Sequence, residues 1–530
     1  MDSIYAGARL CQVHNPGNAL VEWQRLQSSD VRPLKLRSFL SWIQDNALAD
    51  SAKALAVHPI AYVDAGTDSW RFLPQRQIKM PSGDMTVPGL RILFDHLRFR
   101  VARIRRRFLN QLAGIVIACG KALSRYGSFW HVKGLLTIAI VDFIAVSLVR
   151  RKSKNSVVVV KMDRLGDYIL CRKFLKLIRN HPRYQSQKIH LCANINLRDL
   201  IEAYDGSSFD GFIWIDPAKM MGQPVYRFGL LKKIKLLGAK VAIHPTYARE
   251  TYIGDCLVFA TRASERVGRE CYAAVESAVR HSRSLEAKIG DLFYNHIEPE
   301  QHNVVFEFDR YRSFFSRILP GVEMPKDTQF TALQVPVPEI GGAFAVIMPG
   351  ANQAFRQWPP EYFARVAQHL HDRYGLRIVV IGSRDEKPNA LAMQKAAPET
   401  PMEDFCGELS LPQIVWLASR CAVGITNESG GTHLLAALDK PCVAVANGNR
   451  FGWFYPYPKE FSSSVRFVYP PAFVAEKLTW NQRAEAYRED GKYHRISDIS
   501  PDTVIEQIAS ILQSSTAHNS VLSKTPDLGG

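Results

Sequence analysis

The sequence lacks the residue pairings that would indicate a disulfide framework or a structural zinc site. Nine cysteines are scattered through 530 residues, and none forms a C-x-x-C pair. An odd number of unpaired cysteines is typical of a reducing compartment. The sequence also has no Asp-x-Asp and no cluster of histidines and carboxylates with the spacing of metal ligands. We therefore expect neither a divalent metal nor any other cofactor.

Motifs for several ligand classes and for membrane insertion are missing as well. No G-x-G-x-x-G follows the first strand predicted below and no Walker sequence occurs, which argues against a dehydrogenase or a P-loop enzyme. The first residues have no apolar core of a secretory signal. Two apolar stretches, residues 112–119 and 135–149, are shorter than the roughly twenty residues of a transmembrane helix, and the second contains Asp142. These absences favour a cytoplasmic protein.

Positive charge, in contrast, is abundant. The formal net charge of +17 should attract anionic partners such as nucleic acid, a membrane surface or phosphorylated substrates. Residues 91–154 begin with arginines interleaved with aromatic and aliphatic residues, which predicts basic amphipathic helices. Two interpretations stay open for them: contact with an anionic membrane surface, or packing on their own domain. No nucleic-acid-binding signature is present, so we expect no nucleic-acid partner. Residues 1–90 have no recognisable role.

From residue 155 onward, strand and helix patterns alternate. Residues 157–160 are a β-branched run, typical of a strand buried on both faces, and a turn and an amphipathic helix follow. A break rich in charge and proline at residues 298–337 precedes a second such series. We predict two Rossmann-like α/β domains facing a cleft, at 155–335 and 340–513, with an extra N-terminal region and a disordered tail at 514–530.

The first candidate site residue lies where the first strand of this region gives way to a helix. Open parallel sheets bind ligands at the carboxyl ends of their strands. Asp167 follows Gly166 at the start of the helix, where the helix dipole should keep its carboxylate ionised. Such a carboxylate can act as a general base toward a hydroxyl group. The alternative is an aspartate that only caps the helix.

Two turns of the second domain supply further candidates. Gly350 lies in a turn of small residues that leads to Arg356, whose guanidinium suits a phosphate, although a solvated surface arginine is equally compatible. Residues 421–447 read as a strand, a glycine-bearing turn, a helix and a strand. Backbone N–H groups at such a turn can approach an anion, and His433 lies one turn into the helix. An ordinary βα turn with a core histidine is the alternative.

Four motifs in order resemble those of glycosyltransferase family 9, the ADP-heptose:lipopolysaccharide heptosyltransferases, which have the GT-B fold. The motifs are R-L-G-D at 164–167, P-G-A and R-Q-W-P at 349–351 and 356–359, F-C-G-E-L-S-L at 405–411 and E-S-G-G-T-H at 428–433. In the last of them the family usually has D-T/S-G-x-x-H. The resemblance covers residues 157–512, and residues 1–150 lie outside it.

The resemblance implies an inverting transfer of heptose from ADP-heptose to a lipopolysaccharide-core or other lipid-linked saccharide. Asp167 would be the base and Arg356 the basic residue at the donor phosphates. A loop wraps the donor diphosphate in the family, and its positions here are Glu428, Ser429, Gly430, Gly431, Thr432 and His433. Gly350 and Glu386 are further donor-side candidates, Glu386 as one of two neighbouring carboxylates facing the nucleoside. Arg164 and Arg249 are acceptor-side candidates.

The loop departs from the family pattern at Glu428, which carries one methylene more than the usual aspartate. Two other functions stay open at this point: a nucleotide-sugar epimerase of similar architecture and a non-catalytic saccharide-binding relative. The expected partners are a nucleotide-sugar donor, a lipid-linked saccharide acceptor and, as an open question, an anionic membrane surface. The location implied is the bacterial cytoplasm, with peripheral contact to the inner face of the inner membrane left open.

Overall fold

The structure is a computed structural model. It describes residues 61–64, 69–72, 141–142, 144–145, 155–271, 290–300, 306–458, 460–487 and 492–522. The chain divides into two units, residues 1–117 and 118–530. In the first unit, β1 (Ala61–Asp64) pairs antiparallel with β2 (Ser69–Phe72). The helices predicted for residues 91–154 lie outside the described residues, apart from four positions between 141 and 145.

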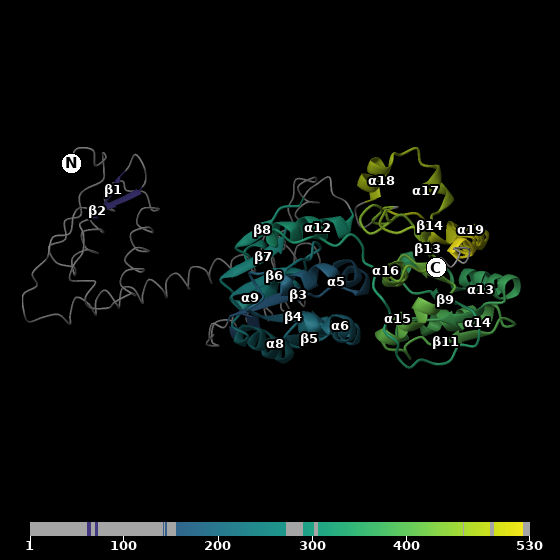
Figure 1. Cartoon of the computed structure of the whole chain (residues 1–530), viewed down its shortest axis with the longest axis horizontal. Coiled ribbons are helices and arrows are strands. Elements are labelled where there is room, and N and C mark those ends of the chain that lie inside the picture. The colour runs from purple at the N-terminus through teal and green to yellow at the C-terminus, as the bar shows by residue number, and fades with distance from the viewer. Residues whose placement is uncertain are drawn as a thin grey trace, which may run out of the picture. The chain divides into compact units, whose positions relative to one another are not determined.

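The first α/β domain is built on a parallel sheet of six strands in the order β5-β4-β3-β6-β7-β8. The strands are β3 (Ser156–Lys161), β4 (Lys188–Asn194), β5 (Gly211–Ile215), β6 (Val241–His244), β7 (Glu265–Arg269) and β8 (His296–Glu298). Alternate valines of β3 serve opposite cores, because successive side chains of a strand point to opposite faces. Val157 and Val159 pack with α5, α6 and α12, whereas Val158 and Val160 pack with α7, α8 and α9. These helices are α5 (Leu165–Asn180), α6 (Arg198–Asp205), α7 (Pro217–Gly222), α8 (Pro224–Leu236), α9 (Cys256–Thr261) and α12 (Glu307–Ile318) (Figure 1).

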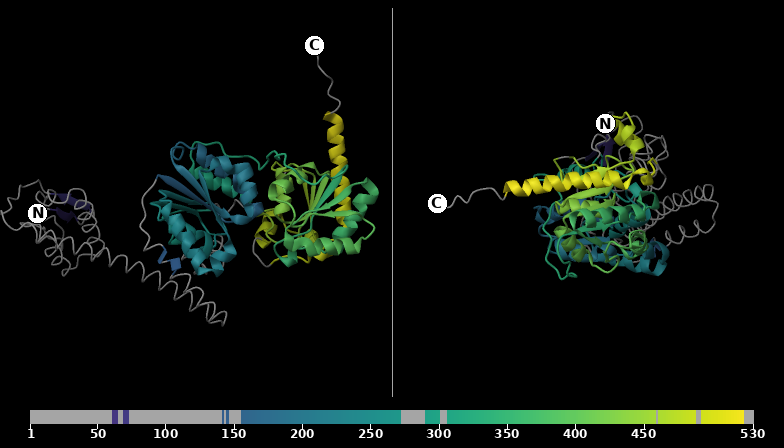
Figure 2. Two further views of the ribbon diagram at one scale, coloured as in Figure 1. Left: turned by 90° about the horizontal axis from the view of Figure 1, so that it is seen from below. Right: turned by 90° about the vertical axis from the view of Figure 1, so that its right-hand side faces the viewer.

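The second domain repeats this plan, with the strand order β11-β10-β9-β12-β13-β14. Its strands are β9 (Phe344–Met348), β10 (Arg377–Val380), β11 (Met402–Asp404), β12 (Val423–Asn427), β13 (Cys442–Val445) and β14 (Val465–Val468). One face carries α13 (Pro360–Tyr374), α14 (Lys387–Ala396) and α19 (Pro501–Leu522); the other carries α15 (Leu411–Arg420) and α16 (Gly430–Ala437). Two short helices, α17 (Pro471–Ala475) and α18 (Trp480–Tyr487), pack on Phe451. Figure 2 shows α19 as one long rod beside this sheet.

Both sheets therefore have the strand order 3-2-1-4-5-6 when each is numbered from its own first strand. In this order the connections leave the first strand in opposite directions, and ligands bind where the order reverses, at the carboxyl ends of the strands. The switch points are the β3/β6 pair in the first domain and the β9/β12 pair in the second. The predicted fold class is confirmed, and the topology indicates where a ligand should bind.

Three expectations about elements were incomplete or wrong. The break predicted at 298–337 contains helix α12, whose Phe308, Tyr311 and Phe315 form a buried stripe at i, i+3 and i+7. The short strands β7, β8, β11 and β14 were not predicted from the sequence. The tail predicted from residue 514 is helical as far as Leu522, since no glycine or proline interrupts α19 after its first residue.

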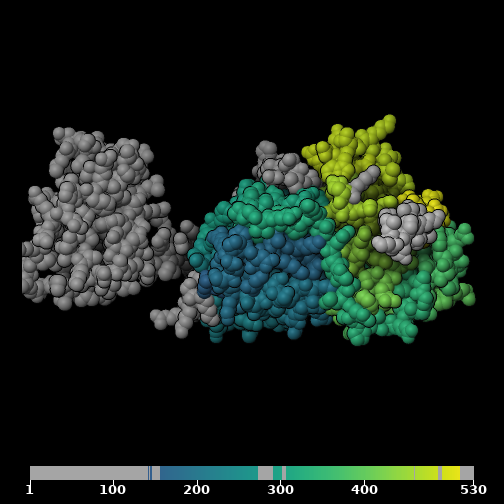
Figure 3. Space-filling view, in the orientation of Figure 1, coloured from purple at the N-terminus to yellow at the C-terminus, as the bar shows by residue number. Residues whose placement is uncertain are grey.

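The two α/β domains share one hydrophobic core cluster, which runs from α5 and α12 to α15, α16 and residues 453–457. Rings of Phe306 and Phe308 in the first domain contact Tyr457 and Phe461 of the second, at centroid distances of 4.8–5.9 Å. Figure 3 shows the two domains in direct contact. The amino ends of α5 and α16, both named as site elements from the sequence, meet at this contact.

Candidate functional site

Asp167 lies in the first turn of α5, directly after the carboxyl end of β3. The helix begins with Arg164 as an extended N-cap residue that makes no side-chain capping bond. Burial, reinforced by the negative charge of Asp163, raises the pKa of Asp167 to about 7, although Lys161 opposes the shift. We expected the helix dipole to keep this carboxylate ionised, but burial raises the pKa so far that the group is only about half ionised at neutral pH. A carboxyl with a pKa near 7 is suited to proton transfer.

Gly166 is required by a close approach of the second domain. A Cβ built on Gly166 would lie 2.5 Å from Cδ2 of His433, and one on Gly430 would lie 3.1 Å from Cβ of Leu165. His433 is buried; its Nδ1 lies 2.6 Å from the hydroxyl of Tyr457, and burial lowers the pKa of His433 to about 4. The neutral imidazole thus packs against the turn that carries Asp167 and joins the two domains.

Adding a methyl group at this contact should loosen it. We expect Gly166→Ala to lower the free energy of unfolding by about 1–3 kcal/mol, the usual cost of overpacking a tight core. The matched control is Gly229→Ala in α8, where a Cβ would meet nothing within 4 Å and alanine should be neutral or stabilising. Urea denaturation of the two variants measures the difference, and equal stabilities would show that the contact has no energetic weight.

Asp163 and Lys161 lie near Asp167 and influence its pKa. Neither was among the site residues predicted from the sequence. Nζ of Lys161 lies 2.6 Å from both the Asp163 carboxylate and the hydroxyl of Tyr311. Thr246, at the end of β6, donates to the same carboxylate at 2.6 Å. Burial alone would raise the pKa of Asp163, but Lys161 and these hydrogen bonds hold it below its usual value. Asp163 therefore stays negative beside Asp167, at the switch point of the first sheet.

At the switch point of the second sheet, Gly350 and Glu386 belong to one structure. A Cβ on Gly350 would overlap the carboxyl of Glu386, and one on Gly382 would lie 2.2 Å from Oε2 of Glu386. The carboxyl accepts a hydrogen bond from the Ser383 amide at 2.6 Å as part of a capping box, and burial raises the pKa of Glu386. Its neighbour Asp385 is exposed. The structure thus places Glu386, and not Asp385, over the turn after β9.

Arg356 is held from two sides by side chains of neighbouring turns. It ends a short 3₁₀ helix (Ala354–Arg356) after β9, and its NH1 lies 3.4 Å from Oε2 of Glu428, just past β12. Its NH2 donates to Oδ1 of Asn449, which follows β13 and is fully buried. The surface-arginine interpretation was therefore wrong. Asn449 was missed, since the N-G-N-R sequence around it reads as an ordinary turn.

Polar atoms of these three residues are buried without a hydrogen bond. Among the described residues, Nε of Arg356, Oε2 of Glu428 and Nδ2 of Asn449 have no hydrogen-bond partner. Such atoms are rare in folded proteins, because desolvation without a partner is costly. One such atom in the Arg356 guanidinium and two in its neighbouring side chains together indicate a binding place for a polar ligand.

Glu428 connects the donor-side cluster with Asp167. Burial raises the pKa of Glu428 to about 7; Arg356 and Arg450 oppose this shift, whereas the charge of Asp167 reinforces it. The two carboxyls, one from each domain, are therefore close enough to influence each other's ionisation. Like charges that approach in a desolvated site favour at least one neutral form.

The remaining residues of the 428–433 loop hold the turn in shape. Oγ of Ser429 accepts from the Gly431 amide at 3.4 Å, and the hydroxyl of Thr432 donates to the Asn427 carbonyl at 2.9 Å. The Thr432 amide donates to the Ser429 carbonyl. Several polar groups of the loop, which we predicted to bind a diphosphate, therefore make hydrogen bonds within the loop itself. Contact between the loop and a ligand remains a prediction.

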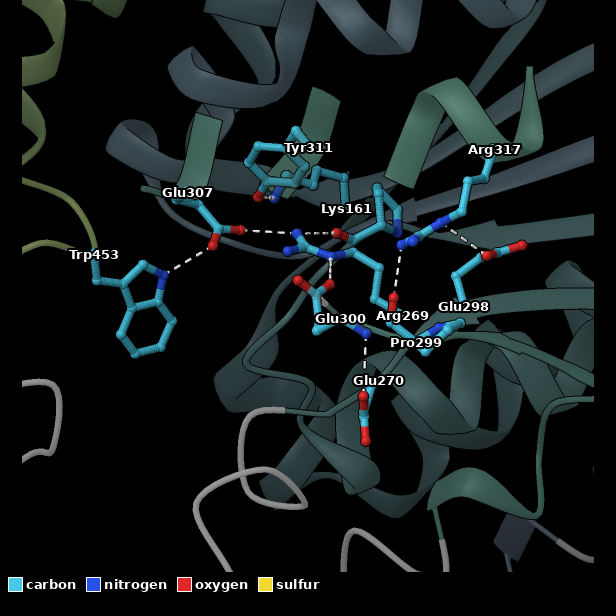
Figure 4. Close-up of polar contacts among 11 residues, drawn as sticks. Lys161, Arg269, Glu270, Glu298, Pro299, Glu300, Glu307, Tyr311, Arg317 and Trp453 are labelled. Atoms are coloured by element: carbon cyan, nitrogen blue, oxygen red, sulfur yellow. Dashed lines mark hydrogen bonds and ion pairs between the residues drawn. The ribbon is translucent and has the colours of Figure 1, made fainter. Parts of the chain in front are cut away.

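The buried carboxylate of Glu307, at the start of α12, links the two domains through hydrogen bonds. One of its oxygens accepts from NH1 of Arg269 and the other from the indole N–H of Trp453, both at 2.8 Å (Figure 4). The Glu307 amide in turn donates to the Trp453 carbonyl at 2.8 Å. The charge of Glu307 also contributes to the raised pKa of Asp167. The two hydrogen bonds between Glu307 and Trp453 hold the second domain beside Asp167. The sequence did not predict this contact.

The two acceptor-side arginines differ in their surroundings. Arg164 is exposed beside Asp167, as the prediction requires. Arg249 is buried, and its guanidinium is ion-paired with Asp255 at 3.1 Å and Asp291 at 2.5 Å. The assignment of Arg249 as an acceptor contact was wrong, because a guanidinium neutralised by two carboxylates in the interior of its domain has a structural role.

In the part of the chain that the structure describes, no group of three or more histidine, cysteine, aspartate or glutamate side chains is arranged to hold a metal ion. No described helix combines the length and the apolar character needed to span a bilayer.

Comparison with known proteins agrees with this architecture. The solved structure of a family 9 glycosyltransferase from Veillonella parvula superposes with a TM-score of 0.51, covering 69% of this chain and 99% of that one at 17% identity. The two Rossmann-like domains, each with its switch point at the domain contact, define a protein of the GT-B class.

Residues 282–460 match the family model described as Glycosyltransferase family 9 (heptosyltransferase). Lipooligosaccharide heptosyltransferase 2 of Haemophilus influenzae is 26% identical over 161 residues, and lipopolysaccharide heptosyltransferase 2 of Salmonella typhimurium is 27% identical over 161 residues. Each alignment covers 30% of this chain and 43% of the relative, so the match spans less than half of their length. These matches support assigning residues 282–460, which include most of the second α/β domain, to glycosyltransferase family 9.

Proposed function

We propose that the protein is an inverting glycosyltransferase that moves heptose from ADP-heptose to a lipopolysaccharide-core or other lipid-linked saccharide acceptor. The observation that carries this proposal is the contact between the turn of Asp167 in one domain and the 428–433 loop of the other, where a Cβ on Gly166 would lie 2.5 Å from Cδ2 of His433. A base with a pKa of about 7 and a polar cluster with unsatisfied atoms then share one site. The family and the named activities of its relatives support the choice of heptose and of the acceptor class.

The donor would lie in the second domain. Arg356 offers a forked, permanently charged group that suits phosphate oxygens. Nδ2 of Asn449, which has no hydrogen-bond partner, would donate to a phosphate oxygen, and Oε2 of Glu428 would accept from a hydroxyl group of the donor. Stabilising the departing diphosphate by fixed positive charge removes the need for a general acid at the leaving group.

The first domain would supply the base and orient the acceptor. Asp167 accepts the proton of the acceptor hydroxyl as that oxygen attacks the anomeric carbon from the face opposite to the diphosphate. Lys161 neutralises the neighbouring carboxylate of Asp163. Asp167 is then the group whose charge changes when the proton of the acceptor is taken up. The domain contact through Glu307 and Trp453 would limit water at the anomeric carbon and so limit donor hydrolysis.

The pH dependence of turnover should report the pKa of Asp167. A base must be deprotonated, so kcat/KM should fall tenfold per pH unit below about pH 7, the value to which burial raises this pKa. Asp163→Asn removes a neighbouring negative charge and leaves Lys161 unopposed; both changes lower the pKa of Asp167. The inflection should therefore move to lower pH in Asp163→Asn. An unchanged profile would contradict the assignment.

Release of ADP tests the proposal directly. We expect the full-length protein to release ADP from ADP-heptose only when a lipopolysaccharide-core acceptor lacking the heptose is present, with inverted configuration at the new linkage. UDP-N-acetylglucosamine, offered alone, tests for the epimerase alternative. ADP release independent of acceptor, or conversion of that sugar, would overturn the proposal.

A further inference from the structure

Helix α8 in the first domain has apolar residues on both of its sides. The inward side carries Leu230, Leu231 and Ile234, which pack in the core below the sheet. The outward side carries Val225, Gly229, Lys232, Lys233 and Leu236. The spacing i, i+4, i+7, i+8 and i+11 places these five residues along one face. In Figure 1 the helix lies at the edge of the domain beside α9 and β5.

The apolar residues of this outward face are unusually accessible. Val225 is 86% exposed, Leu236 is 44% exposed, and Met221 at the end of α7 is 41% exposed. Single exposed apolar side chains are common, but several gathered on one helix face indicate an interaction surface. Because the core contacts of α8 come from its opposite side, the packing of this domain gives no reason for valine and leucine on the outward one.

The charge of the same segment has one sign. Residues 217–240 include six lysines and arginines and no acidic residue. Arg227 is turned inward and paired with Asp142, whereas Lys219, Lys232, Lys233 and Lys240 are exposed. Of these four, Lys219 lies 3.5 Å from the carboxylate of Asp216, which directly precedes the segment. We call the surface formed by Lys219, Met221, Val225, Lys232, Lys233, Leu236 and Lys240 the α8 face.

We propose that the α8 face docks on an anionic lipid bilayer, with Val225, Leu236 and Met221 entering the interface and the lysines contacting lipid phosphates. Apolar side chains flanked by lysines on one side of a helix suit the boundary between headgroups and acyl chains. Lysine stems can also bury their methylenes while their ammonium groups reach phosphate. A protein partner would need a surface that is both acidic and apolar and that matches the α8 face in shape. An anionic bilayer is acidic at its headgroups and apolar below them, and it needs no matching shape.

This surface is distinct from the candidate site at the domain contact. It does not depend on the transferase activity, because the test measures binding to lipid alone. If the acceptor is lipid-linked, docking through the α8 face would hold the first domain at the surface where such an acceptor resides.

The experiment is flotation of the full-length protein with vesicles of phosphatidylcholine containing about one-third phosphatidylglycerol, beside vesicles of phosphatidylcholine alone. We expect wild type to float with the anionic vesicles and to be released by high salt. Val225→Asp and the double variant Lys232→Glu/Lys233→Glu should each reduce the bound fraction at least tenfold. The matched control is Val474→Asp, at a 61% exposed valine of α17 in the second domain, which should bind like wild type.

Three results would overturn the proposal. The first is absence of wild-type binding to anionic vesicles. The second is equal binding of wild type, Val225→Asp and Lys232→Glu/Lys233→Glu, which would assign any binding to another region. The third is a change in oligomeric state by Val225→Asp without a change in vesicle binding, since the α8 face would then contact protein. All the substituted side chains are exposed, and circular dichroism confirms that each variant is folded.

Discussion

Asp167→Asn is expected to lower kcat by about 10²–10⁴-fold, the usual contribution of a positioned general base. Asparagine has the size of aspartate but cannot accept the acceptor proton. The half-buried position in the first turn of α5 should tolerate the amide, so the fold should persist. Steady-state ADP release with a lipid-linked acceptor measures the loss.

The affinity for the donor serves as the control for this variant. If Asp167 acts only on the acceptor, the Kd for ADP-heptose should change less than about threefold, as titration calorimetry can show. A larger loss of donor affinity would make Asp167 a donor ligand. Retention of more than a tenth of wild-type kcat would exclude Asp167 as the base.

Arg356→Ala should have the second-largest effect, a loss of about 10²–10³-fold in kcat/KM for the donor, comparable to removing one fixed charge-stabilising group. Two causes combine. The donor diphosphate loses its cationic partner, and Glu428 loses the nearby positive charge that opposes its raised pKa. We expect Arg356→Lys to be intermediate, since lysine keeps the charge but loses the fork that Glu428 and Asn449 hold.

Arg365→Ala is the matched control for this substitution. Arg365 lies on α13 of the same domain, is 59% exposed and pairs with Asp502 at 2.8 Å. Exposed ion pairs contribute at most about 1 kcal/mol, so donor kinetics should stay at wild-type values. Equal kinetic losses in Arg356→Ala and Arg365→Ala would point to a general effect of lost positive charge and against a specific phosphate contact.

The electrostatics of the candidate site depend on the contact between the domains. Asp167 and Glu428 each have a pKa of about 7 because burial removes water from their carboxyls. The charges of Asp163 and Glu307 add to the raised pKa of Asp167, and the charge of Asp167 adds to that of Glu428. Opening the contact would return water to both carboxyls and lower both pKa values. Closure thus prepares Asp167 to take up a proton near neutral pH.

Individual elements show how far local sequence information reaches. The β-branched run of β3 and the helix that follows it were predicted within a few residues, since both have strong local periodicity. Helix α12 was hidden, because its acidic and basic residues dominate the composition while its buried stripe depends on contact with α5. The partners of Arg249 could not be predicted either, as Asp255 and Asp291 lie 6 and 42 positions away.

By itself the sequence determined the two Rossmann-like series, the turns at the ends of β3, β9 and β12, and the resemblance to glycosyltransferase family 9. Strand and turn propensities act over a few residues, and motifs preserve their order along the chain. Only the tertiary structure decided the pKa of Asp167, the contacts of Arg356 with Glu428 and Asn449, and the packing of His433 on Gly166. The physical reason is that desolvation and charge coupling depend on distance in space. Residues as far apart in the sequence as Gly166 and His433, 267 positions, meet only when the two domains are in contact.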